Sequence, residues 1–378
     1  MSSSFGLSRS ISVSGVYHAC QSWSLAMVAC LLSAPAVAAP ITYEMVTVGD
    51  AGNAADTGGT QNGSVAYEYE IGKYDVTIGQ YMEFLNAVAK SDPYNLYNTN
   101  MGSNPATRGI SRTGSSGSYD YSVIGPDGTA YGQSAANRPI TYVSWFDAAR
   151  FANWMSNGQG NGSTESGAYD LGNAAPGEAP ARTPGASFYI PDTNEWYKAA
   201  YYSPTVNSNT GGYYTYATQS NATPGNTIGS TANQVNWYTT GRGMSVTQSQ
   251  AYDPNQNYLT DVGAFTNSGS YYGTFDQSGN VNQWTDLDGV PGSLRGLRGG
   301  YWFFDQFGDP SYLSSSYGGQ QNPTAESNLF GFRLVGSVPS GVPEIDPNSF
   351  GSALAMVMGS IAMLERRVRR AFSRRTAV

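Results

Sequence analysis

The chain has 378 residues, of which 40% are hydrophobic and 12% are charged, with 46 Gly, 28 Tyr and 7 Trp. This is enough apolar material for one or two sizeable cores, and it excludes a disordered tail protein. Lys and Arg number 19 against 27 Asp and Glu, for a net charge of −8, so there is no basic surplus to neutralise phosphates and no nucleic-acid partner is expected.

The first 38 residues have the pattern of an export signal. Arg9 precedes an apolar run over 25–32, and the segment ends in Ala-Val-Ala at 36–38, the small-residue pattern that signal peptidase recognises. We predict a signal peptide over 1–38, cleaved after Ala38. The alternative is a membrane anchor, which the short apolar run disfavours.

The rare residues all lie in this predicted signal. Cys20 and Cys30 are the only cysteines and His18 is the only histidine. A chain processed after Ala38 would contain neither residue type. This excludes disulfides, thiol nucleophiles, zinc sites of the Cys/His type, Ser-His-Asp triads and imidazole acid–base chemistry.

Three helices are predicted in the middle of the chain, each from a capping box followed by apolar residues on one face. They cover 77–88, 144–155 and 192–200, and the box pairs are Thr77 with Gln80, Ser144 with Asp147, and Asp192 with Glu195. Short β-prone runs lie at 41–48, 65–71, 140–143, 187–190, 297–303 and 332–335. Gly-, Ser-, Asn- and Pro-rich loops cover 50–63, 101–136, 157–186 and 203–232. The pattern predicts an α+β fold with much irregular chain.

Several large or charged side chains in this part are expected to be structural. Buried tryptophans fill the space between poorly regular layers in a loop-rich domain, and the candidates are Trp145, Trp154, Trp196, Trp284 and Trp302. Buried ion pairs are expected between the arginines Arg138, Arg298 and Arg333 and the acids Asp75, Asp147 and Glu195.

The C-terminal end has three parts in order. A Val-Pro-Glu-Ile-Asp-Pro sequence at 342–347 precedes an apolar segment at 350–364 and an arginine-rich tail that ends at Arg375. The arginines would stay cytoplasmic if the short apolar segment entered a membrane. Residues 341–378 resemble the PEP-CTERM sorting signal of bacterial surface proteins. The resemblance implies recognition by an exosortase-type protease; an amphipathic C-terminal helix is the alternative.

Six segments occur in an order that resembles a known enzyme family. They are 70–81, 138–149, 190–200, 273–281, Arg298-Gly299-Gly300 and Gly331-Phe332-Arg333. Together they resemble the formylglycine-generating enzyme, or sulfatase-modifying factor, family, with a domain over 39–340. The resemblance implies an irregular, loop-rich variant of the C-type lectin-like fold.

Active members of this family bind copper through two cysteines and use oxygen to convert a substrate cysteine to formylglycine. Counted from Gly299-Gly300, the positions of the pair read Phe304 and Asp309, and a nearby serine reads Tyr301. Thiolates hold Cu(I) and oxygen ligands replace them poorly, so copper and oxidase activity are not expected. Carboxylate chemistry at Asp286 with Asp288, or at Asp305 with Asp309, is an alternative, although the first pair also fits an ordinary polar turn.

Calcium is the metal that the resemblance favours. Family members bind it partly through backbone carbonyls, and the positions that correspond are Asn236, Trp237, Asp253, Ser278, Gly279, Val281 and Gln283. The last is usually Glu in the family, so the amide here should weaken affinity.

The sequence as a whole predicts an exported bacterial envelope, surface or matrix protein that acts as a binding or structural module. Loops 101–136 and 203–232 carry Tyr, Asn, Ser and Gly, which suit a polysaccharide or protein ligand. Two alternatives remain open: an active sulfatase-modifying oxidoreductase, and a passive matrix component without a specific ligand.

Overall fold

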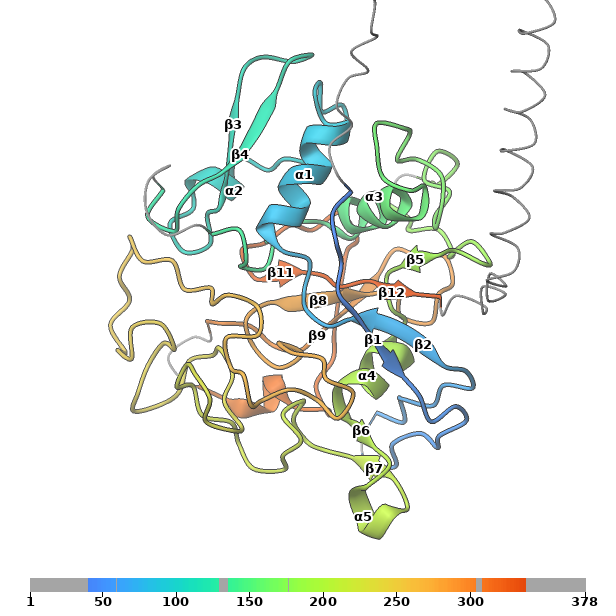
Figure 1. Ribbon diagram of the computed structural model, residues 1–378, viewed down its shortest axis with the longest axis vertical. Helices are drawn as coiled ribbons and strands as arrows, with labels where there is room; N and C mark the ends of the chain where they lie inside the picture. Colours follow the sequence, from blue (N-terminus) through green and yellow to red (C-terminus); the bar gives the residue numbers. More distant parts are fainter. Residues whose placement is uncertain (1–39, 59, 129–134, 176, 304–307, 338–378) are drawn as a thin grey trace, which may run out of the picture. The chain divides into compact units, whose positions relative to one another are not determined.

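The computed structural model describes residues 40–337 except 59, 129–134, 176 and 304–307 (Figure 1). The described elements belong to the unit that begins at Ile41. The predicted signal peptide and the C-terminal sorting segment, with its apolar stretch at 350–364, lie outside the described residues. Within the described ranges, no helix has the length and apolarity needed to cross a membrane.

The three longest helices begin where the capping boxes predicted. They are α1 (Ile78–Val88), α3 (Trp145–Ser156) and α4 (Thr193–Tyr201), and in each the cap side chain and the side chain three residues later bond to each other's backbone N–H. The shorter α2 (Asn100–Ser103) precedes a hairpin, and α5 (Val206–Asn209) is a turn with left-handed residues inside it.

One four-stranded antiparallel sheet joins the two ends of the domain in the order β1-β2-β12-β5. Its strands are β1 (Met45–Val48), β2 (Tyr69–Gly72), β12 (Val335–Gly336) and β5 (Phe188–Tyr189). Val335 pairs with Ile71 on one side and with Tyr189 on the other, so the C-terminal strand is inserted between N-terminal and central ones.

The second four-stranded sheet has the order β10-β9-β8-β11, and β11 runs parallel to β8. Its strands are β8 (Asn282–Thr285), β9 (Arg295–Arg298), β10 (Gly319–Gln321) and β11 (Phe330–Gly331). The 3-10 turn η1 (Pro310–Leu313) lies between β9 and β10. Every residue of β8 and β9 is buried, so the two central strands lie inside the domain, whereas β10 is largely exposed.

Two small hairpins complete the described elements. The strands β3 (Ile110–Thr113) and β4 (Asp120–Val123) form the first, and β6 (Tyr202–Ser203) and β7 (Gly212–Tyr213) form the second. The first hairpin lies beside α1 (Figure 1). The first hairpin lies in 101–136 and the second, apart from Tyr202, lies in 203–232. Both segments were predicted as loops, and that prediction is wrong for these strands.

The core confirms the predicted role of the tryptophans. All five are buried, and their exposed fractions range from 0% to 4%. Phe84 and Phe151 bring α1 and α3 together with ring centroids 5.3 Å apart, and Trp154 lies against both. The fold is therefore α+β and loop-rich, as predicted.

Three predicted strands are wrong or displaced; the run predicted over 332–335 is in a strand only at Val335, where β12 begins. Residues 140–143 form no strand because Tyr142 has φ +60, a left-handed conformation that breaks an extended run. The strand predicted over 297–303 is Arg295–Arg298 instead. It ends there because Gly299 and Gly300 have φ +100 and +72.

Candidate functional site

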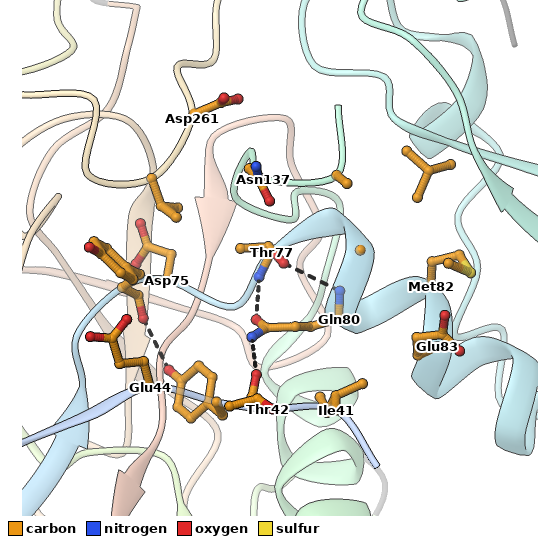
Figure 2. Close-up of a pocket in the computed structure, with 16 residues that line it drawn as sticks. Ile41, Thr42, Glu44, Asp75, Thr77, Gln80, Met82, Glu83, Asn137 and Asp261 are labelled. Atoms are coloured by element: carbon orange, nitrogen blue, oxygen red, sulfur yellow. Dashed lines mark hydrogen bonds between the residues drawn. The ribbon is translucent and has the colours of Figure 1, made fainter. Parts of the chain in front are cut away.

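An open pocket of about 780 Å³ lies between the start of β1, the start of α1 and two loops. Residues 41–44 form one wall, Tyr74 to Glu83 form the floor and a second wall, and the loops contribute Ala136, Asn137, Asp261 and Val262. Figure 2 shows Asp75, Glu44 and Asp261 on one side of the pocket and Glu83 on the other, beyond Gln80.

Backbone and amide hydrogen bonds fix these walls in place. The Gln80 side chain caps α1 at Thr77 and also donates to the carbonyl of Thr42, which ties the N-terminal segment to the helix (Figure 2). Gly79 N–H donates to the carbonyl of Ala136, and Val262 N–H donates to the carbonyl of Asn137. The start of α1 therefore holds the loop at Ala136, and that loop in turn holds the loop at Val262.

The described pocket lining carries four carboxylates and neither Lys nor Arg; the acids are Glu44, Asp75, Glu83 and Asp261. Three of these acids pair with cations that do not line the pocket, and Arg333 is the partner of Asp75. Lys73 donates to Glu44 at 2.7 Å, and Arg138 Nε lies 3.9 Å from Asp261. Of the four acids, Glu83 is the one without an ion pair in the described chain.

Asp75 is the buried member of the four. Arg333 Nη2 lies 3.1 Å from its Oδ1, and neither side chain is exposed. Its other oxygen, Oδ2, is buried and has no hydrogen-bond partner among the described residues. Burial raises the pKa of Asp75 to about 8, and Arg333 opposes this rise.

Arg333 joins the pocket floor to the core. It donates to the carbonyls of Gly72 and Phe275 and, through Nε, to Gln283 Oε1 at 2.6 Å. Trp196 Nε1 donates to the same amide oxygen at 2.6 Å. The predicted pairing of Arg333 with Asp75 is confirmed, and its second anchor on Gln283 was not anticipated.

The other predicted arginine pairings are wrong. Arg298 donates to the carbonyl of Tyr317 and lies over the ring of Tyr197, without a carboxylate within ion-pair distance in the described chain. Glu195 pairs instead with Arg182 at 3.4 Å. Asp147 has no cation within this distance in the described part; its carboxylate accepts from Ser144 N–H and hydroxyl at the start of α3.

The predicted carboxylate pair at Asp286 and Asp288 forms a turn. Gly289 N–H donates to the Asp286 carbonyl, and Asp288 is exposed. Asp286 is buried with its Oδ1 2.9 Å from Arg295 Nε. Of the second pair, Asp305 lies outside the described residues, and Asp309 accepts from Ser311 N–H at the start of η1.

Of the two positions that correspond to the family's cysteines, Phe304 lies outside the described residues and Asp309 is the capping residue of η1. Tyr301 precedes the undescribed segment 304–307. The described chain therefore offers an acceptor carboxylate at the second position, which is not a ligand type suited to Cu(I).

The predicted calcium residues are brought together in part. Asn280 N–H donates to the carbonyl of Asn236, and Gly279, with φ +85, lets the chain pass there because a Cβ would lie 2.5 Å from that oxygen. Ser278 and Val281 flank this contact in sequence. Asp253 is exposed and accepts from Asn255 N–H.

Some of the predicted calcium ligands have oxygen atoms that already accept hydrogen bonds. The Trp237 carbonyl already accepts from Asn226 and Ser245. The oxygen of Gln283 receives the Arg333 guanidinium, so it does not fit a calcium ligand in this arrangement. In the described ranges, no three His, Cys, Asp or Glu side chains are grouped closely enough to hold a metal. Calcium stays a prediction, resting on Asn236 and the 278–281 backbone.

Residues 42–338 match the family described as the sulfatase-modifying factor enzyme 1-like domain. The chain belongs to this family. The resemblance drawn from the six sequence segments is thereby confirmed. No curated protein matches the sequence.

Three solved structures are similar to this sulfatase-modifying-factor domain. The match to the crystal structure of CarF covers 79% of this chain and 99% of that chain, at 19% identity and a TM-score of 0.45. Treponema denticola variable protein 1 matches over 79% and 96%, at 17% identity and a TM-score of 0.47. PvdO from Pseudomonas aeruginosa matches over 79% and 93%, at 16% identity and a TM-score of 0.38.

Sequence reasoning missed the acidic pocket of this sulfatase-modifying-factor domain. Asp75 was singled out only as an arginine partner, and Glu44, Glu83 and Asp261 were not singled out. Glu83 follows from the helix prediction as an exposed position on α1. The approach of Asp261 to the other acids depends on the bond between Val262 and Asn137, for which the sequence carries no local signal.

Proposed function

We propose that this chain is an exported ligand-binding domain of the sulfatase-modifying-factor type that has lost cysteine oxidase activity. The observation that carries the proposal is the residue inventory: after Ala38 the sequence contains neither Cys nor His. Cu(I) requires soft ligands, and the carboxylates and amides that remain prefer harder metals. The chain would thus keep the family's fold without the cysteines that bind copper in its active members.

The local geometry at the second cysteine position supports this proposal. Asp309 accepts from Ser311 N–H at 2.9 Å and begins η1, so its side chain has a structural role there. Among other polar side chains, Asp286 is engaged by Arg295 and by Tyr169. A carboxylate held by a buried cation is poorly suited to proton transfer with a substrate.

The binding role is assigned to the pocket that Asp75 and Glu44 line. This pocket has a volume of about 780 Å³, and its acids are held by an ordered frame around the start of α1. The ligand would come from outside the cell, a polysaccharide or a protein of the envelope or matrix. We propose that the segment 1–38 directs export and that an exosortase-type protease processes 341–378 after membrane entry of 350–364.

An oxidase assay on the exported protein tests the loss of activity. The protein is loaded with Cu(I) and mixed with a cysteine-containing peptide in air, and peptide mass and oxygen consumption are followed. Intact-mass mapping of the same sample locates its N-terminus. We expect an N-terminus after Ala38 and no peptide conversion. Copper-dependent conversion would instead establish the alternative function, a sulfatase-modifying oxidoreductase.

A screen against extracellular polysaccharides and proteins tests the binding role. We expect at least one ligand whose binding is weakened by substitutions in the pocket that contains Asp75. A screen in which the folded, exported protein binds none of them would favour the passive matrix component.

A further inference from the structure

We propose that the pocket between β1 and α1 binds an alkyl ammonium or guanidinium group, with Asp75 Oδ2 as its anchoring acceptor. The inference rests on the proposed binding function and names the class of ligand for that site. The ligand chemistry is a positive nitrogen group on an aliphatic stem, as in a free diamine or the side chain of Lys or Arg.

The first support is that one carboxyl oxygen of Asp75 has no hydrogen-bond partner. Arg333 pairs with Oδ1, while Oδ2 is buried and has no donor among the described residues, and Asp75 is one of the residues that line the pocket. An acceptor left without a donor in a buried place is costly, and a charged N–H donor is its strongest partner. Burial raises the pKa of Asp75 to about 8, so the group is a carboxylate acceptor above that pH, and a cation beside Oδ2 would lower this pKa.

The second support is the distribution of charge. Lys73 and Arg138 approach Glu44 and Asp261 from outside the lining, at 2.7 and 3.9 Å. Glu83 makes no ion pair or side-chain hydrogen bond within the described chain, and it lies at the other end of the pocket (Figure 2). An incoming positive group therefore meets an unpaired carboxylate at Glu83 and ion-paired carboxylates at the other end.

The third support is the apolar surface between these acids. Ile41, Met82, Val123 and Val262 line the same pocket and can cover an aliphatic stem. Tyr43 and Tyr74 line the same pocket, and aromatic faces favour organic cations; Lys73 already lies over the Tyr74 ring, 5.2 Å from its centroid. Carboxylate, aromatic ring and aliphatic wall together match the parts of an alkyl ammonium or guanidinium group.

A divalent metal fits this pocket less well. The acids are spread along it, and in the part of the chain that the structure describes they form no group of three that could hold a metal. Asp75 already faces the Arg333 guanidinium, which repels a compact dication. An extended organic cation reaches separated carboxylates without bringing them together.

Calorimetric titration of the full chain with 1,5-diaminopentane tests the inference. The neutral probe 1-pentanol has the same stem, and CaCl₂ provides a divalent cation. We expect the diamine to bind and 1-pentanol not to bind, with affinity falling as salt increases. Equal binding of both probes, no binding of the diamine, or displacement of bound diamine by equimolar Ca²⁺ would overturn the proposal.

Substitutions place the binding in the pocket. Asp75→Asn keeps the shape of the side chain, and we expect it to weaken diamine binding by about tenfold or more. Glu83→Gln changes an exposed carboxylate without described partners, and it should weaken binding by about three- to fivefold. The matched control Glu178→Gln removes an exposed carboxylate outside the pocket and should change nothing.

Glu83→Gln keeps the test decisive if Asp75→Asn does not fold. Diamine binding that is unchanged in Glu83→Gln, or equally weakened in Glu178→Gln, would contradict the assignment. Parallel titrations with Nα-acetyl-lysine amide and Nα-acetyl-arginine amide separate the two sources. Tighter binding of these amides than of the diamine assigns a protein side chain, and the reverse order assigns a free amine.

The oxidase assay and this titration fail independently. Copper-dependent peptide conversion would overturn the proposed function whatever the diamine result. A chain that shows no conversion, binds an extracellular ligand and ignores the diamine would retain the proposed function and lose only the ligand class.

Discussion

Arg333 and Asp75 form an ion pair at 3.1 Å in which neither side chain has any solvent exposure. The arginine also holds the carbonyls of Gly72 and Phe275 and the amide of Gln283. The pair therefore connects the end of β2 in the first sheet, the start of β8 and the floor of the acidic pocket.

We expect Arg333→Met to destabilise the protein by about 3 to 5 kcal/mol, because it removes the buried donor that Asp75, Gln283 and the carbonyls of Gly72 and Phe275 share. Urea unfolding followed by tryptophan fluorescence measures the change. Exposed Arg242 is the control, and Arg242→Met should lie within about 0.5 kcal/mol of the parent. Equal effects of the two substitutions would contradict a structural role for the pair.

A glycine pair tests the close approach of the chain at Gly279. Gly52 has a similar positive φ, +81, but a Cβ there would meet nothing within 4 Å. Gly52→Ala should cost about 1 to 2 kcal/mol for the left-handed backbone alone. Gly279→Ala should cost about 3 kcal/mol or more, because its Cβ also meets the Asn236 carbonyl. Unfolding free energies that are the same for both variants would show that the approach is not tight.

Stability should fall as pH rises from about 5 to 7.5. Burial raises the pKa of Asp147 to about 7, and Asp192 and Asp276 shift in the same direction, to about 7 and about 6. An Asp in the unfolded chain has a pKa of about 4, so the native state binds more protons than the unfolded state across this range. Native stability therefore falls as these carboxyl groups lose their protons.

Urea midpoints at the two pH values measure this dependence. Asp147→Asn keeps an oxygen acceptor for the start of α3 and should flatten the slope. A midpoint that increases toward pH 7.5 in the parent protein would contradict the direction of these pKa shifts.

Calcium binding, if carried by Asn236 and the backbone of 278–281, should be weak. We expect Tm to rise at millimolar Ca²⁺, to stay unchanged at micromolar Ca²⁺ and to return to its starting value with EDTA. Mg²⁺ at the same concentration serves as the control. A Tm that does not change at millimolar Ca²⁺ would contradict the prediction that the protein binds calcium.

The sequence predicted the parts of the fold that depend on neighbouring residues. Each capping box joins side chains three residues apart, so Ser144 and Asp147 mark the start of α3 without knowledge of the rest of the chain. The hairpin of β3 and β4 was missed because its polar, Gly-rich sequence resembles a loop. Each strand has a single buried residue, Ile110 in β3 and Tyr121 in β4, which is too few to give an alternating pattern.

Non-local features lay beyond such patterns. The left-handed conformation of Tyr142, whose N–H donates to the carbonyl of Ser327, converts a β-prone run into irregular chain. The pocket is similar: Asp75 and Asp261 line it together only because the loop at Ala136 bonds to the start of α1 and the loop at Val262 bonds to Asn137. Composition predicted an acidic protein but not where its acids would gather.

The most direct test of the central claim is a Cu(I) titration of the exported protein under anaerobic conditions, with a competing chelator and with its N-terminus established by mass. The account predicts no stoichiometric binding, because the chain after Ala38 has no thiolate or imidazole. Tight binding of one Cu(I) per chain would contradict it.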